Sequence, residues 1–531
     1  MTTVATSEEA PQLPPAVPLM SNADFRALAN PRSRELLRLA QYLDRRHWKS
    51  SALTRPLLGE IFHQATYLEE LLDAYGARYN ERWRPYRATM AAAKLFAGVN
   101  YVLLHIQHSL PAYRLLPVEG DFVAATAEAV EFSGQVLLRI GRRMLLQARQ
   151  LELDAPPGDN RDEEWEESLP PGRLAHNRKG HRAVDASETV TYLATAFLNQ
   201  AAGSELLHVP MRIRPSEYLR CVPETVSEEE VRRLQHQFHN LQSLYDTFVS
   251  DTDTERLNPD LPVLRGHISV IFHLLETATG FAHYYERHVM GNTARLPEGR
   301  VPLVDGRQLI DYLMRYSLSF ASRFLTAGRE LCQKMLKRYA EIGRVEVAGP
   351  RYRGFHVRPA TLVAKIVCHY GSKVSMELAG DSFDASSPMD IFRANEKINR
   401  EKRAWLSAEV DKLPCIREAE FFSDPCQAVR RVVFTLAEQG KIVIYQRPLP
   451  ARSPEESDAY KDPLQYVLDE VKRLQTTGVI DIETEITVAF VGDKRVLKDL
   501  RLLAGCGYGE DHFGNNTPLP KEIAYLRRGQ V

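Results

Sequence analysis

Cysteine is scarce in this chain, with six residues among 531, and no two of them form a C-x-x-C pair. Spacing this wide argues against a zinc ribbon and against the disulfide framework of a small secreted domain. We therefore expect reduced thiols. The six residues are Cys221, Cys332, Cys368, Cys415, Cys426 and Cys506.

An excess of charge of either sign is also missing, because 68 Lys and Arg side chains stand against 69 Asp and Glu side chains. No global field then attracts nucleic acid or an anionic lipid surface. The sequence therefore predicts no nucleic-acid partner.

Long apolar runs are missing as well. The most apolar stretch, Ala91–Leu110, is interrupted by Lys94, Asn100 and His105, which makes it unsuitable for a membrane span. The first residues lack a basic region that leads into an apolar core, so residues 1–21 are expected to form a disordered tail rather than a signal peptide. We expect a cytoplasmic protein without a membrane span.

Helical periodicity dominates the first part of the chain. A chain of this length is expected to hold several domains. In residues 22–153 apolar side chains recur at helical spacing, as in the stripe of Val130, Leu137 and Met144. The pattern predicts a helical bundle with four helices, at Asp24–Arg46, Arg55–Tyr79, Arg84–Leu110 and Asp121–Leu151.

A second helical region is expected over residues 185–343, after a segment at 154–184 that is rich in Pro, Gly and charge and reads as a linker or exposed loop. Ser227–Glu230 is typical of a helix start. The segment that begins at Phe132 aligns weakly with the segment that begins at Tyr316, and two His-bearing helices precede each. Two related bundles are one interpretation; a chance likeness of amphipathic helices is the other.

The periodicity changes after Gly343. Val345–Val347 and Val374–Leu378 read as strands with a helix between them, which indicates an α+β module. Within it, Arg353–Val367 reads RGFHVRPATLVAKIV. Pro359 suits the first turn of a helix, which places His356 just before the helix N-terminus. Amide groups and the helix dipole favour an anion there, Arg358 can bond two phosphate oxygens, and a neutral imidazole is nucleophilic.

At these residues the chain resembles the HPr family, the histidine phosphocarriers of the bacterial sugar phosphotransferase system. Gly354–Ala360 matches the hallmark G-(L/F)-H-x-R-P-A, and Leu378–Phe392 is similar to a second landmark, in which Ser387 stands 31 residues after His356. Asp424–Gln439 is similar to the family's last helix. The resemblance implies an open-faced α+β sandwich over residues 344–446.

The resemblance also implies roles for residues. His356 would accept a phosphoryl group from an enzyme I type donor and Arg358 would stabilise it. Ser387 would be a regulatory phosphorylation site, or simply a helix N-cap. Met389 and Phe392 would dock partners, or pack in the core.

The chain departs from the family at several places. Ser386 stands where the family usually has lysine, and Arg393–Lys412 reads as a prolonged helix. Ile416–Phe422 is our expectation for the fourth strand. Residues 447–531 form an extension, a small α/β unit with a helix at Leu464–Leu474, a strand at Ile486–Val491 and a turn at Gly505–Gly509.

Histidine pairs in the helical region are weaker signals. Glu60 with His63, and His105 with His108, have spacings that can ligate metal in a bundle, but sixteen histidines make chance pairs expected. We expect neither a metal nor another cofactor.

These observations predict a cytoplasmic regulatory phosphoprotein rather than a turnover enzyme. Its HPr-like domain would take a phosphoryl group on His356 and signal to or through the helical region, or to a downstream phosphotransferase or regulatory protein. An interaction scaffold that keeps the HPr-like fold without carrying phosphate is the competing hypothesis. An enzyme or metalloprotein with a site near His63, His105 and His108 is the third.

Overall fold

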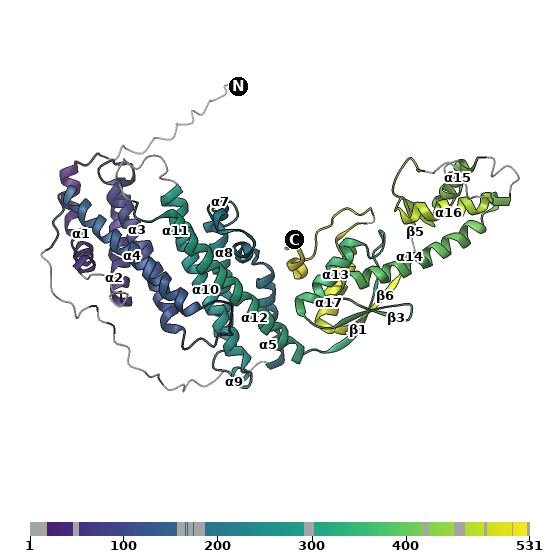
Figure 1. Ribbon diagram of the computed structural model, residues 1–531, viewed down its shortest axis with the longest axis horizontal. Coiled ribbons are helices and arrows are strands. Elements are labelled where there is room, and N and C mark those ends of the chain that lie inside the picture. The colour runs from purple at the N-terminus through teal and green to yellow at the C-terminus, as the bar shows by residue number, and fades with distance from the viewer. Residues whose placement is uncertain are drawn as a thin grey trace, which may run out of the picture.

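The structure is a computed structural model that describes residues 18–45, 53–156, 165, 167, 174, 186–290, 302–417, 424–450, 462–482, 486–511 and 513–527. Figure 1 shows an elongated molecule, with a large helical region at one end, a small sheet covered by helices beside it, and a further small unit at the tip of one long helix. Most of the expected tail and of the expected linker lies outside the described residues.

The first four predicted helices are confirmed. Thr54 and Asp121 cap the second and fourth through their side chains, which accept from the amides of Leu57 and Ala124. The helices pack as a closed ring in which each contacts the next and the last contacts the first. They are α1 (Asn22–Arg45), α2 (Arg55–Ala74), α3 (Arg84–Ser109) and α4 (Phe122–Gln150), with the short η2 (Ala77–Tyr79) between α2 and α3.

The second set of long helices packs in the same cyclic order. In it, α5 contacts α8, α8 contacts α10, α10 contacts α12, and α12 returns to α5. The predicted start at Ser227 is confirmed, since its hydroxyl accepts from the amide of Glu230. The set comprises α5 (Ala186–Ala202), α8 (Glu228–Phe248), α10 (Asp260–Tyr284), which continues as the π-helical η6 (Tyr285–Val289), and α12 (Ser319–Arg338), which follows α11 (Gly306–Asp311) and the π-helical η8 (Tyr312–Leu318).

Helix α3 joins the two rings by packing on α10. It is the one described helix long and apolar enough to cross a membrane by length and composition, and 72% of its most apolar window is buried inside the protein. Burial of this kind is typical of a helix in a protein core. Between the second ring's long helices run the short segments η4 (Glu205–His208), α6 (Val209–Arg212), η5 (Pro215–Glu217), α7 (Tyr218–Cys221) and α9 (Asp253–Leu257).

One residue of the expected linker or exposed loop belongs to the helical core. Trp165 is buried, and its carbonyl accepts a hydrogen bond from the hydroxyl of Thr54 at 2.7 Å. Glu167 forms an ion pair with Arg55 at 2.6 Å. These contacts hold this part of the segment against the start of α2.

The sheet is antiparallel throughout, with strand order β1-β6-β2-β3. Its strands are β1 (Ile342–Ala348), β2 (Val374–Leu378), β3 (Asp381–Asp384) and β6 (Thr487–Asp493). The helices that pack with it are α13 (Val357–Tyr370), α14 (Pro388–Asp411) and α17 (Lys494–Gly505). The two predicted strands and the prolonged helix are thereby confirmed.

Among the residues that the structure describes, helices cover one face of this sheet. Val345, Met376 and Phe490 are paired across three strands and buried in the core that includes α13, α14 and α17. On the opposite face Arg344 forms an ion pair with Glu377, and both remain partly exposed. A strand that buries every second side chain supports one helical layer, so this unit is a two-layer α+β arrangement.

Two expectations about this unit are wrong. The fourth strand is β6 rather than Ile416–Phe422, of which the first two residues lie in η9 (Pro414–Arg417) and the rest lie outside the described residues. The last helix on the sheet is α17 rather than Asp424–Gln439. The sheet therefore takes a strand from beyond residue 446, where we expected this domain to end.

The segment between α14 and β6, residues 412–486, builds a second small core instead; we call it the insertion. Asp424–Gln439 does form a helix, but its buried side chains belong to the core that includes the end of α14 and not to the core of the sheet. The predicted helix at Leu464–Leu474 is confirmed. The elements are α15 (Pro425–Glu438), β4 (Ile442–Ile444), α16 (Pro463–Thr476) and β5 (Ile480–Ile482), and β4 pairs with β5.

Candidate functional site

The loop before His356 adopts a conformation that requires glycine. Arg353 and Gly354 both have positive φ, at 53° and 63°. A Cβ on Gly354 would lie 2.2 Å from Oδ1 of Asn395, which accepts a hydrogen bond from the amide of Phe355 at 2.8 Å. Asn395 on α14 therefore fixes the loop and leaves no room for a side chain at Gly354.

The insertion also holds this loop. The buried Asp481 of β5 accepts from the amide of Arg353 at 3.0 Å and pairs with the buried Lys402 of α14 at 2.9 Å. The guanidinium of Arg353 donates to the carbonyl of Gly478 at 3.0 Å. The insertion is thus part of the scaffold of the site.

His356 occupies the predicted position at the end of a helix. It is the N-cap of α13 and has an extended backbone, and its side chain makes no capping hydrogen bond. The side chain is 25% exposed. The amides of the first turn of α13 and the positive end of its dipole lie next to an accessible imidazole, as an anion site requires.

A carboxylate holds one side of the imidazole ring. Nε2 of His356 lies 2.7 Å from Oε2 of Glu510, whose side chain is only 7% exposed. An ionised carboxylate can only accept, so Nε2 donates, and in the neutral imidazole the lone pair then resides on Nδ1. Within the described residues Nδ1 has no hydrogen-bond partner. The arrangement fixes the ring and its tautomer, as the acid of a catalytic triad does.

Arg358 lies beside the same carboxylate. Its Nε is 3.9 Å from Oε1 of Glu510, and its Nη1 donates to Oδ1 of Asn516 at 2.5 Å. The structure thus brings both predicted site residues, His356 and Arg358, together around Glu510. A guanidinium at this place can bond phosphate oxygens once it turns from Asn516.

Glu510 and Asn516 were missed by sequence reasoning. They belong to the loop after α17, which begins with the expected turn at Gly505–Gly509. There Tyr508 has a positive φ of 59°, is buried, and donates its hydroxyl to the carbonyl of Ala348 at 2.8 Å. The available signal was this glycine-rich turn followed directly by the acid Glu510. The turn places the carboxylate beside the N-terminus of α13.

Ser387 caps a helix, as its simpler interpretation predicts. Its hydroxyl accepts from the amide of Asp390 at 3.3 Å at the start of α14. Of the two docking candidates, Met389 is 66% exposed, whereas Phe392 is partly buried against the core. Only Met389 therefore offers its side chain freely to a partner.

Replacing Ser387 with alanine is expected to destabilise the first turn of α14 by about 1 kcal/mol, because the cap on the Asp390 amide is lost. Hydrogen exchange of the Asp390 amide should become roughly fivefold faster. Ser386→Ala is the matched control, since Ser386 bonds Asp384 and caps no helix. Equal exchange in both variants would contradict the assigned cap.

The histidine pairs of the helical region do not assemble a metal site. Among the residues that the structure describes, no group of three or more His, Cys, Asp or Glu side chains could hold an ion. The ring of His105 packs against that of His273 at 4.4 Å, and Glu60 accepts from Gln64 instead. His63 and His105 therefore carry no argument for metal chemistry.

The C-terminal end of α13, opposite His356, meets the helical region. Nε2 of Gln333 in α12 donates to the carbonyls of Cys368 and His369 at 2.9 Å each. The ring of His369 reaches Oδ1 of Asn199 in α5 at 3.0 Å. One helix thus joins the candidate site to the helical region.

Comparison with known proteins adds no relative to this geometry: no family model matches the chain, and neither does any curated protein or any solved structure.

Proposed function

We propose that this chain is a cytoplasmic regulatory protein in which the sheet unit is a phosphocarrier domain of the HPr kind. His356 accepts a phosphoryl group from an enzyme I type donor and signals to or through the helical region. The observation that carries the proposal is the imidazole of His356 at the N-terminus of α13, with Arg358 alongside and Nε2 held by the buried Glu510.

The chemistry needs little from the protein beyond this arrangement. The lone pair on Nδ1 attacks the phosphorus, and the bond from phosphorus to the donor breaks as the new P–N bond forms. Nε2 keeps its proton throughout and donates it in the hydrogen bond to Glu510. First-turn amides and the Arg358 guanidinium can neutralise the added oxygens, because a phosphoryl group brings about two negative charges.

The two-layer α+β arrangement also supports the proposal, since the resemblance implies an open-faced sandwich. The motif Gly354–Ala360 occupies the loop and helix start that the chemistry requires. Only the assignment of the later landmarks changes, because the fourth strand and the last helix come after the insertion.

Coupling to the helical region would run along α13. At a rise of about 1.5 Å per residue, roughly 20 Å of helix separates the site at the N-terminus of α13 from its C-terminal contact with the helical region. Charge added at His356 can shift α13 or release Arg358 from Asn516. Partners therefore include the donor and, downstream, either a phosphotransferase or regulatory protein or the chain's own helical region.

One observation favours the alternative, a scaffold that never carries phosphate. Asn516 already occupies the guanidinium of Arg358, and the carboxylate of Glu510 lies beside the same guanidinium, where its negative charge would repel a bound phosphoryl group. A sheet unit kept only as a binding surface would tolerate both contacts.

The test is incubation of the full chain with phosphoenolpyruvate, enzyme I and HPr from the same cell, followed by intact mass measurement at neutral pH. We expect a single phosphate that is lost in acid, because phosphohistidine is acid-labile. An incubation without enzyme I should leave the mass unchanged. If the relay phosphorylates its own HPr but leaves this chain without phosphate, the result would favour the scaffold.

A further inference from the structure

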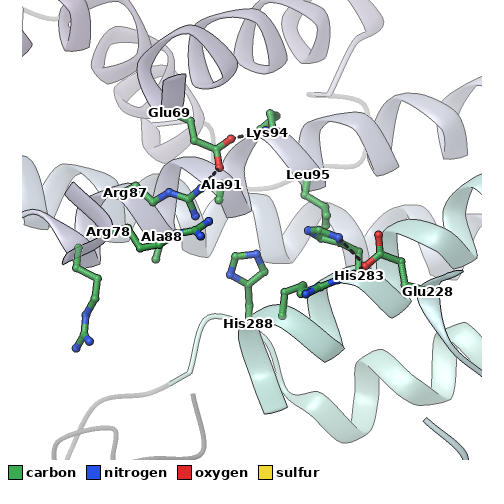
Figure 2. A pocket seen from close by; sticks show the side chains of 12 residues that line it. Glu69, Arg78, Arg87, Ala88, Ala91, Lys94, Leu95, Glu228, His283 and His288 are labelled. Atoms are coloured by element: carbon green, nitrogen blue, oxygen red, sulfur yellow. Dashed lines mark ion pairs between the residues drawn. The ribbon is translucent and has the colours of Figure 1, made fainter. Parts of the chain in front are cut away.

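A cavity of about 590 Å³ opens where the two rings of helices meet. Its wall comes from α2, η2 and α3 on one side and from α8, α10 and η6 on the other. Figure 2 shows His283, at the end of α10, and His288, in η6, pointing towards the side chains of α3. A concave site of this size between two packed units suits a small molecule.

The lining is strongly cationic. Five permanently positive side chains stand against two carboxylates, which leaves three positive charges in excess when both histidines are neutral. The cations are Arg78, Arg84, Arg87, Lys94 and Arg287, and the carboxylates are Glu69 and Glu228.

Both carboxylates of the wall already form ion pairs. Glu69 is buried and forms ion pairs with Arg87, at 2.9 Å, and with Lys94. Glu228 lies 3.0 Å from Nδ1 of His283 and 2.6 Å from Arg232. These pairs organise the wall. Arg287 also lies 3.7 Å from Glu228, so neither carboxylate is left for Arg78 or Arg84.

Arg78 and Arg84 supply charge that neither carboxylate of the wall pairs, although the field of Arg78 also acts on Asp73, which forms an ion pair with Arg87 outside the wall. In the part of the chain that the structure describes, neither guanidinium makes a hydrogen bond or an ion pair. Both side chains are exposed, so they can turn towards an anion in the cavity without breaking an existing ion pair. Guanidinium groups bond phosphate oxygens in pairs.

The positive side chains of the wall also act on His288. Burial, together with the nearby His283, Arg87, Arg78 and Lys94, lowers the pKa of His288 to about 4. Its ring stacks on Tyr284 at 5.0 Å in the π-helical turn η6, a kind of turn that is frequent at functional sites. A neutral imidazole in this place adds a polar group to the wall without adding charge.

From these contacts we propose that the cavity binds a small phosphorylated metabolite that carries at least two negative charges. Arg78 and Arg84 bind its phosphate oxygens. Arg87 and Lys94, which form ion pairs with Glu69, add positive charge to the same wall. Ala91 and Leu95 of α3 form an apolar strip in the wall, where the carbon part of the ligand packs. The site lies in the helical region and does not depend on phosphate transfer to His356.

Calorimetric titration of the full chain with inorganic pyrophosphate tests this site. We expect one binding event per chain, weakened by roughly a hundredfold in the double variant Arg78→Gln/Arg84→Gln, because each charge-assisted hydrogen bond to phosphate contributes about tenfold. The control Arg142→Gln/Arg149→Gln removes the same charge from the exposed side of α4 and should keep the wild-type affinity.

Three results would overturn the proposal. If the wild-type chain binds no pyrophosphate at millimolar concentration, the proposed site does not exist. Equal weakening in both double variants would mean attraction by overall charge. Loss of binding in His356→Ala, with the Arg78→Gln/Arg84→Gln variant unchanged, would place the anion at the other site.

Discussion

Alanine in place of His356 is expected to abolish phosphate loading by the enzyme I relay completely. The imidazole is the nucleophile in the proposal, and neither Arg358 nor Glu510 can form the acid-labile bond to phosphorus that it forms. Intact mass at neutral pH measures the loss. The fold should survive, because the His356 side chain makes no capping bond and is partly exposed.

The matched control is His63→Ala, which removes another accessible histidine from the surface of α2. That variant should load one phosphate like the wild type. A thermal melt of each variant separates loss of chemistry from loss of fold. Phosphate that persists in His356→Ala would exclude His356 as the acceptor, whatever the activity of the relay.

Exchanging Glu510 for glutamine is expected to slow loading on the order of a hundredfold, because it reverses the tautomer of His356. The glutamine amide can donate to Nε2, which moves the ring proton to Nδ1 and removes the nucleophilic lone pair. Glu510→Ala should be slowed less, by roughly tenfold, since it only frees the ring. The initial rate of mass gain gives both values.

Glu510 is proposed as a positioning residue, so a second measurement should follow the ring itself. Nitrogen-15 NMR of His356 is expected to show the lone pair on Nδ1 in wild type and on Nε2 in Glu510→Gln. Glu510→Asp should restore part of the rate, and Glu522→Gln, which changes an exposed residue of η12 (Lys521–Arg527), is the charge-matched control. Faster loading in Glu510→Ala would instead identify the carboxylate as a barrier to phosphate.

The helices were predictable because their signals are local. The stripe of Val130, Leu137 and Met144 is buried along one face of α4, and Ser227 caps α8 as its sequence context indicates. The same holds for α13, whose start next to His356 follows from Pro359. In each case the information lies within one or two turns of helix.

The fourth strand and the last helix of the sheet unit were not predictable in this way. Helix α15 buries Val429, Val432 and Val433 along one face, and that pattern is the same whichever core receives it. The strand β6 pairs Phe490 with Val345, far apart in sequence. Periodicity predicts that a face is buried but not against which partner.

The sequence by itself determined that a histidine and an arginine stand at the start of a helix, because Gly354, Pro359 and the apolar spacing of α13 act within a few residues. Only the tertiary structure decided that Glu510, 154 residues away, holds that histidine, and that α3 and α10 gather cations around one cavity. Such contacts depend on the path of the whole chain. Distant side chains meet where the cores pack, and no local pattern records that path.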